Sequence, residues 1–154
     1  MGRYYGTAHY DGKFGFGVQS SYDPVDVFGM WDESTDDDEC EANFYLEATD
    51  DALSHIKAEI DKQYDLLEIP ASRRIYEVED NMTIWNLLDE FEDKLYRPFE
   101  KGVDKCIPYY SKKYDEGIVE IRPGIQLAKC RVDLGTKIYS ELLKDGKCWM
   151  WAEV

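Results

Sequence analysis

The spacing of apolar residues changes along the chain, and this change limits the fold more than any other feature of the sequence. At both ends apolar residues alternate with small or polar ones, as they do in half-buried strands. Between the ends they recur every three or four residues, which is the spacing of an amphipathic helix. The sequence therefore predicts an α+β fold, in which an antiparallel sheet of about four strands packs against about three helices.

The N-terminal strands surround the dipeptide Asp11-Gly12, which suits the positive φ angles of a type I′ turn. This turn predicts a hairpin that pairs His9 with Phe14 and Tyr5 with Val18. One face of the hairpin then has almost no side chains, which indicates close approach of another backbone, an aromatic ring or a ligand. The small residues of that face are Gly6, Ala8, Gly15 and Gly17.

Helix ends are signalled in the sequence as clearly as the helices themselves. Thr49 and the two aspartates after it suit a helix start, and Asp145-Gly146 suits a helix end. Residues 99–116 are expected to continue as a helix after Pro98, and residues 118–121 fit either a short strand or the start of the next helix. The remaining predicted elements are a strand over 43–49, helices over 50–67, from 83 to 98 and over 125–145, and a final strand over 147–154. We expect this final strand to pair with the N-terminal sheet.

The length and composition fit one domain over residues 1–154, because 44% of the residues are hydrophobic and 14% are aromatic. The four cysteines form no C-x-x-C pair, so we expect buried thiols in a reducing compartment. Neither a signal peptide nor an apolar run long enough to span a membrane occurs in the sequence. We therefore expect a cytoplasmic protein. The cysteines are Cys40, Cys106, Cys130 and Cys148.

The charge is strongly acidic, with 33 Asp and Glu against 18 Lys and Arg, and it is concentrated in the first half of the chain. Residues 1–70 contain 17 acidic and four basic residues. Such a field repels nucleic acids and anionic membranes, and it attracts basic surfaces or divalent cations. An acidic loop over about residues 32–42 is the predicted partner-binding surface, with Asp32, Glu33, Asp36, Asp37, Asp38, Glu39 and Glu41 as its charged residues.

Known catalytic and ligand-binding motifs are absent. The glycines of DGKFGFGVQSS lie inside predicted strands and open no helix, so they do not form a phosphate-binding loop. The acidic run lacks the glycine and the ligand spacing of an EF-hand. His9 and His55 belong to no catalytic motif, and we expect them to be a cross-strand partner of Phe14 and a helix-surface residue. The sequence predicts no catalytic residue, no metal and no cofactor.

A pocket over the small-residue face of the hairpin is the alternative. It would bind a small molecule or a nucleotide derivative, either as a binding protein or as an enzyme. Its predicted lining is Tyr4, Tyr10, Gln19, Trp149 and Trp151.

The segment GRYYGTAHYDGKFGFGVQSS resembles the start of a family of small phage and bacterial proteins that begin GRYY and continue D-x-x-GKFxFGVQSS. The C-terminal segment DLGTKIYSELLKDGKCWMWAEV is similar to the helix and short strand that end these proteins. The family has no assigned activity, so the resemblance transfers no catalytic residue. It implies an accessory or anti-defence role in the bacterial cytoplasm. Together with the charge it favours a non-enzymatic protein that binds a basic protein surface, and the acidic insertion at residues 32–42 departs from the family pattern.

Overall fold

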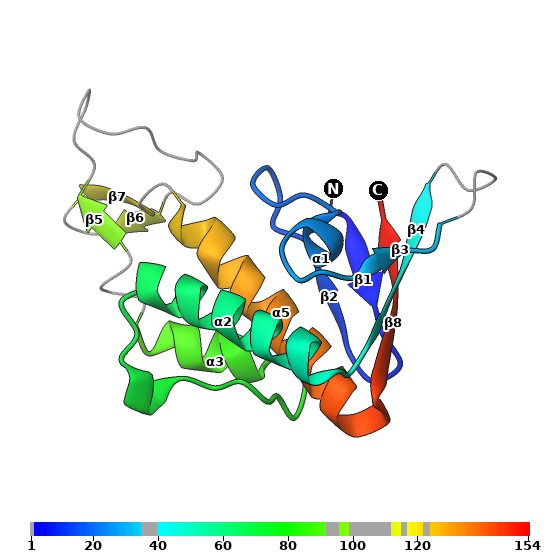
Figure 1. Ribbon diagram of the computed structural model, residues 1–154. Coiled ribbons are helices and arrows are strands. Elements are labelled where there is room, and N and C mark those ends of the chain that lie inside the picture. Colours follow the sequence, from blue (N-terminus) through cyan, green and yellow to red (C-terminus); the bar gives the residue numbers. More distant parts are fainter. Residues whose placement is uncertain (1, 35–39, 92–95, 99–111, 115–116, 122–123) are drawn as a thin grey trace.

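The computed structural model describes residues 2–34, 40–91, 96–98, 112–114, 117–121 and 124–154. In these residues a five-stranded antiparallel sheet has the order β2-β1-β8-β4-β3, and helices pack beside it (Figure 1). The predicted α+β class is confirmed. The main sheet consists of β1 (Tyr4–Gly6), β2 (Asp11–Lys13), β3 (Trp31–Asp32), β4 (Glu41–Glu47) and β8 (Lys147–Glu153).

The helices expected over 50–67 and 125–145 are confirmed, whereas the helix expected from 83 to 98 ends at Asp89, and residues 96–98 are a strand instead. The helices are α1 (Asp23–Asp26), α2 (Asp50–Leu66), α3 (Thr83–Asp89) and α5 (Ile125–Asp145), with a 3₁₀ turn at Ala71–Arg73. Thr49 caps α2, because its hydroxyl accepts a hydrogen bond from the backbone N–H of Ala52 at 3.1 Å. Gly146 ends α5 with a φ of 74°. Both ends lie where the sequence predicts them.

A second antiparallel sheet has the order β5-β7-β6, formed by Tyr96–Pro98, Gly117–Ile121 and Lys112–Tyr114. Residues 118–121 are therefore a strand, as one of the two alternatives predicts. The expected helix over 99–116 is wrong at residues 112–114, which are extended and paired. Residues 99–111 of that prediction lie outside the described part of the chain.

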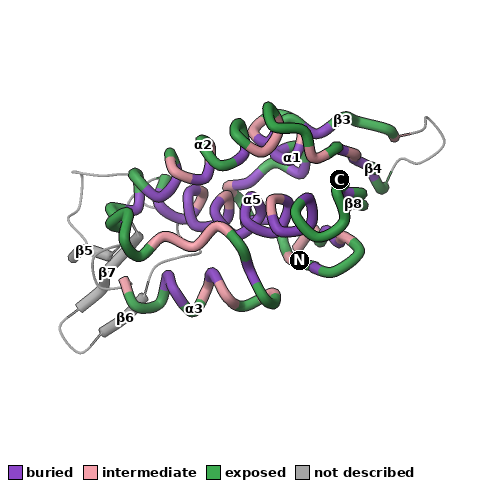
Figure 2. Tube along the Cα trace, turned by 60° about the horizontal axis from the view of Figure 1, so that its bottom comes forward, coloured by how far each residue is buried: buried purple, intermediate pink, exposed green. Residues whose placement is uncertain are grey.

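Helix α5 is the centre of the core. Figure 2 shows it between α2 and α3, with most of its length buried. The inner face of the sheet completes the core, because the alternate residues Cys148, Met150 and Ala152 of β8 are buried and the residues between them are not. The C-terminal strand lies between β1 and β4, so the predicted pairing of the two ends of the chain is confirmed.

The N-terminal hairpin is correct in topology but wrong in register. The chain reverses at residues 7–10, where the N–H of Thr7 donates to the carbonyl of Tyr10 at 2.7 Å. Tyr5 therefore pairs with Gly12 instead of Val18, and Asp11-Gly12 belongs to β2 rather than to a turn. The expected pair of His9 with Phe14 is also wrong, since His9 lies in the turn. The physical reason is burial, because this register places the rings of Tyr5, Tyr10 and Phe14 in the core.

The described residues between the hairpin and β4 pack on the domain. Phe28 and Met30 are buried, and Trp31 and Asp32 add the edge strand β3. Of the predicted buried thiols, Cys130 and Cys148 are buried. Cys40 is exposed, which corrects the prediction, because it lies at the edge of the acidic segment and contributes no side chain to the core. Cys106 lies outside the described residues.

Candidate functional site

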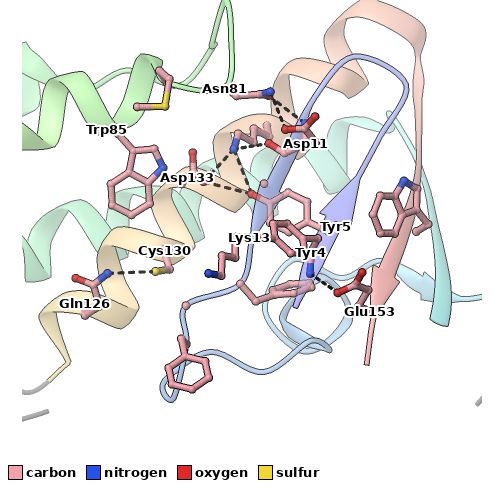
Figure 3. A pocket seen from close by; sticks show the side chains of 17 residues that line it. Tyr4, Tyr5, Asp11, Lys13, Asn81, Trp85, Gln126, Cys130, Asp133 and Glu153 are labelled. Atoms are coloured by element: carbon pink, nitrogen blue, oxygen red, sulfur yellow. Dashed lines mark hydrogen bonds and ion pairs between the residues drawn. The ribbon is translucent and has the colours of Figure 1, made fainter. Parts of the chain in front are cut away.

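A cleft of about 1040 Å³ lies between the N-terminal hairpin and the helices α3 and α5. Its walls come from β1, β2 and β8 on one side, and from α3, α5 and the residues before α3 on the other. Figure 3 shows Trp85, Cys130 and Asp133 on the helical side and Tyr4 and Glu153 on the strand side. Six of its 17 lining residues are aromatic, namely Tyr4, Tyr5, Phe14, Phe16, Trp85 and Trp151.

Three buried polar side chains lie on the inner side of this cleft. The ammonium group of Lys137 is 3.0 Å from Asp133 Oδ2 and 2.9 Å from the backbone carbonyl oxygen of Asp11. The hydroxyl of Tyr5 donates to Asp133 Oδ2 at 3.3 Å. These side chains are nearly inaccessible to solvent, since Tyr5, Asp133 and Lys137 are 1%, 3% and 2% exposed. We refer to Tyr5, Asp133 and Lys137 as the buried polar cluster.

Local sequence explains how the buried polar cluster assembles. Asp133 and Lys137 are four residues apart on α5, so their side chains lie on one face of the helix. Gly12 leaves the space that the cluster needs, because a Cβ there would lie 2.4 Å from the hydroxyl of Tyr5 and 2.9 Å from Lys137 Nζ. The glycine-rich stretch therefore brings the hairpin backbone close to α5. The close approach that the sequence predicts also occurs at two of the glycines it names, since the indole of Trp151 lies over Gly6 and the thiol of Cys130 lies against Gly15.

The electrostatics of the cleft favour neutral groups over reactive anions. Burial raises the pKa of Asp133 and outweighs the opposite effect of Lys137. Burial and the neighbouring Asp133 raise the pKa of Tyr5 well above its usual range. Burial also raises the pKa of Cys130 to about 12. Tyr5 and Cys130 are therefore protonated near neutral pH, and neither is an activated nucleophile.

One oxygen of the buried polar cluster has no partner. The indole nitrogen of Trp85 faces Asp133 and lowers its pKa (Figure 3), but no hydrogen bond of acceptable geometry reaches Asp133 Oδ1. Among the described residues, this atom is buried without a hydrogen-bond partner. A buried acceptor without a partner is unfavourable, so a ligand that donates a hydrogen bond here would stabilise the site.

The structure places two of the five predicted pocket residues in the cleft. Tyr4 and Trp151 line it, and the indole of Trp151 covers Gly6, where a Cβ would lie 2.4 Å from its nitrogen. The other three predicted residues lie elsewhere. Tyr10 is buried and donates to the carbonyl of Val78 at 2.9 Å, Gln19 is buried beside Asp23, and Trp149 stacks on Tyr45 with ring centroids 4.4 Å apart.

Sequence reasoning missed Trp85, Cys130, Asp133 and Lys137, which form the helical side of the cleft. The spacing of Asp133 and Lys137 on α5 was a usable signal. An acidic and a basic residue four apart, inside a helix whose neighbouring positions are apolar, indicate an ion pair on a buried face. The sequence does not say which element covers that face.

The predicted acidic surface is only partly within the described residues. Asp32, Glu33 and Glu41 are exposed, and Asp36, Asp37, Asp38 and Glu39 lie outside that part of the chain. Aromatic residues gather on the neighbouring outer face of the sheet. Trp31 and Trp149 both pair with Tyr45, which lies between them, and the two tryptophans are 63% and 52% exposed.

Comparison with models of protein families, with curated proteins and with solved structures gave no match. The resemblance to small phage and bacterial proteins therefore stays a prediction. Among the described helices, none combines the length and the apolar character that crossing a membrane requires.

Proposed function

We propose that the protein binds a small, flat ligand in the cleft, as the pocket alternative predicts. Asp133 carries this proposal, because its Oδ1 lies at the inner side of a cleft with six aromatic lining residues, where the indole N–H of Trp85 faces it and a ligand N–H would take the place of that donor. A ligand that fits has an unsaturated ring to stack on aromatic side chains and an N–H group to donate to Asp133. Nucleobases and nucleosides have both features.

The net charge narrows the class of ligand further. The chain has a formal net charge of -15, which opposes the approach of di- and triphosphates. Neutral bases and nucleosides are therefore favoured over nucleotides with several phosphates. We propose binding rather than covalent catalysis, because burial keeps Tyr5 and Cys130 protonated.

Two tryptophans of β8 offer a matched test of the cleft. Trp151 lines the cleft, whereas Trp149 is similarly exposed and lies outside it. The purified chain would be titrated with neutral nucleobases and nucleosides by calorimetry. We expect Trp151→Ala to weaken binding about tenfold, since stacking of a base on an aromatic ring contributes about 1–3 kcal/mol. Trp149→Ala should have no effect.

Asp133→Asn gives a second, independent variant. It replaces the acceptor with a group that can donate, and we expect it to abolish binding of ligands that present an N–H. Absence of binding across the whole panel, or equal losses in Trp149→Ala and Trp151→Ala, would refute the proposal.

A second candidate is the role that the charge predicts, binding of a basic protein segment. The observation that favours it is the aromatic row of Trp31, Tyr45 and Trp149 beside exposed acidic residues. Tryptophan and tyrosine are enriched at the centres of protein interfaces, and guanidinium groups stack on their rings. Arginine-rich segments suit this surface better than lysine-rich segments do.

This second candidate is tested with arginine-rich, lysine-rich and acidic peptides of equal length, each titrated over a series of salt concentrations. Binding of the arginine-rich peptide should be the tightest, should weaken as salt rises and should be reduced by Trp149→Ala. Leu66→Ala is the control, because Leu66 is an exposed apolar residue on α2. Affinity that is indifferent to salt, or equal for all three peptides, would exclude this role.

A further inference from the structure

We propose that His9, Glu141 and Asp145 form a site for a divalent transition-metal ion of the zinc class. The three residues lie where the turn between β1 and β2 meets the last turns of α5 (Figure 1). Each offers one ligand atom, and the three atoms lie within 4.8 Å of one another. The site is separate from the buried polar cluster.

The geometry suits a compact coordination sphere. His9 Nε2 lies 3.2 Å from Asp145 Oδ1 and 3.1 Å from Asp145 Oδ2. In a tetrahedral zinc site with bonds of about 2.0–2.1 Å, neighbouring ligand atoms are about 3.3–3.4 Å apart. His9 and Asp145 are therefore already close to the separation that the ion requires. Both side chains are partly exposed, so an ion can reach them from solvent.

Glu141 gives an independent reason to expect a cation. It is 1% exposed, and its Oε1 accepts a hydrogen bond from the backbone N–H of His9 at 3.2 Å. Its Oε2 is buried and has no hydrogen-bond partner among the described residues. A carboxylate in this position is unfavourable unless a positive charge or a donor compensates it. The ammonium group of Lys144 interacts with Glu141 and Asp145 through space, and a metal ion held by the three side chains would place positive charge directly on these carboxylates.

The fold brings these residues together from distant parts of the sequence. Glu141 and Asp145 are four apart at the end of α5, so both face the same neighbour. The observed hairpin register then places His9 in the turn opposite them, whereas the predicted register would place it within a strand. The site depends on the turn at residues 7–10.

The ligand set selects the class of ion. One imidazole nitrogen with two carboxylate oxygens suits Zn²⁺ and related ions, whereas Mg²⁺ and Ca²⁺ prefer oxygen ligands alone. Three protein ligands leave a fourth position for water. The ion would join the hairpin to α5, one helical turn beyond Lys137, and its expected role is to hold the hairpin in place.

The two histidines of the chain allow a matched test. The full chain, stripped with a chelator, would be titrated with Zn²⁺ by calorimetry and with Co²⁺ by absorption spectroscopy. We expect one ion per chain, with affinity reduced at least tenfold by His9→Ala and by Glu141→Gln. His55→Ala is the control, because His55 is exposed on α2 and bonds the carbonyl of Val27. Thermal unfolding of each metal-free variant would verify that it remains folded.

Several outcomes would overturn the site. One is equal loss of affinity in His9→Ala and His55→Ala. Another is a cobalt spectrum dominated by thiolate charge transfer, since that would place the ion on cysteines. Tighter binding of Mg²⁺ or Ca²⁺ than of Zn²⁺, or no zinc binding at all, would also refute the proposed site. The contact between His9 and Asp145 would then be a side-chain contact that holds no zinc ion. Because these tests need no organic ligand, their failure is distinguishable from failure of the proposed cleft function.

Discussion

The ammonium group of Lys137 lies 3.0 Å from the carboxylate of Asp133, and both side chains are almost completely buried. The pair connects α5 to the hairpin, because Lys137 also donates to the carbonyl of Asp11 and Asp133 accepts from Tyr5. Buried ion pairs need such additional hydrogen bonds to offset the loss of hydration. The pair therefore fixes the position of β2, which forms a wall of the cleft.

Lys137→Met should destabilise the protein by about 3–5 kcal/mol, because it leaves the Asp133 carboxylate buried without a charged partner. The double variant Asp133→Asn with Lys137→Met should recover about 2 kcal/mol of that loss, since the charge is then removed as well. Urea unfolding of the wild-type chain, both single variants and the double variant measures this coupling. Strictly additive effects would mean that the two residues do not act as a pair.

Gly135→Ala should destabilise the protein even though alanine favours helices. A Cβ at this position would lie 2.6 Å from Phe28 Cε1 and 2.9 Å from Ile60 Cγ1, in the contact of α5 with α2 and the residues after α1. Overpacking costs about 1–3 kcal/mol, which exceeds the gain in helix propensity of about 1 kcal/mol. Thermal unfolding should show a lower melting temperature. Ser54→Ala, at an exposed position of α2, is the control, and an equal change there would contradict the packing argument.

Tyr10→Phe should lower the free energy of unfolding by about 1 kcal/mol, because it removes a buried hydrogen bond and leaves the carbonyl of Val78 without this donor. Ligand affinity at the cleft should stay the same, since Tyr10 does not line it. Tyr4→Phe changes an exposed hydroxyl and should leave stability unchanged. Calorimetric titration and urea unfolding separate the two effects. If Tyr10→Phe lowered the ligand affinity and left the free energy of unfolding unchanged, Tyr10 would belong to the ligand-binding site.

Cys130 should react slowly with alkylating reagents although it lines the cleft. Burial raises its pKa to about 12, so only about one thiol in ten thousand is ionised at pH 8. Below that pKa its rate should rise about tenfold for each unit of pH, because only the thiolate reacts. Iodoacetamide labelling with peptide mapping measures this, with the exposed Cys40 as the comparison. Equal labelling of Cys40 and Cys130 at pH 8 would show that the cleft wall opens.

Local sequence signals predicted most of the elements. The starts and ends of α2 and α5 follow from a threonine cap, a glycine stop and apolar spacing, all of which act within one or two turns. The final strand follows from strict alternation. The antiparallel sheet and the pairing of the two ends of the chain are likewise confirmed.

The candidate site was only half visible in the sequence. Tyr4 and Trp151 were assigned correctly to the cleft because their strands and faces were correct. Gln19 was placed on a strand, but β2 ends at Lys13, and Gln19 instead accepts a hydrogen bond from the N–H of Gly15. Of the α5 residues that complete the cleft, Cys130 was expected only as a buried thiol, and Asp133 and Lys137 were not assigned, because the sequence does not show which element covers their face of the helix.

The sequence by itself determined the class of fold, the two long helices and the acidic character of the molecule, because these depend on short-range periodicity and on composition. Only the tertiary structure decided the hairpin register. Asp11-Gly12 favours a turn locally, but burial of Tyr10 against Val78 and the closure of the turn by Thr7 outweigh that preference. The same register brings Gly12 against Lys137 and His9 against Asp145. Both proposed sites therefore depend on long-range packing, in which a buried ring contributes more free energy than the preference of one turn dipeptide.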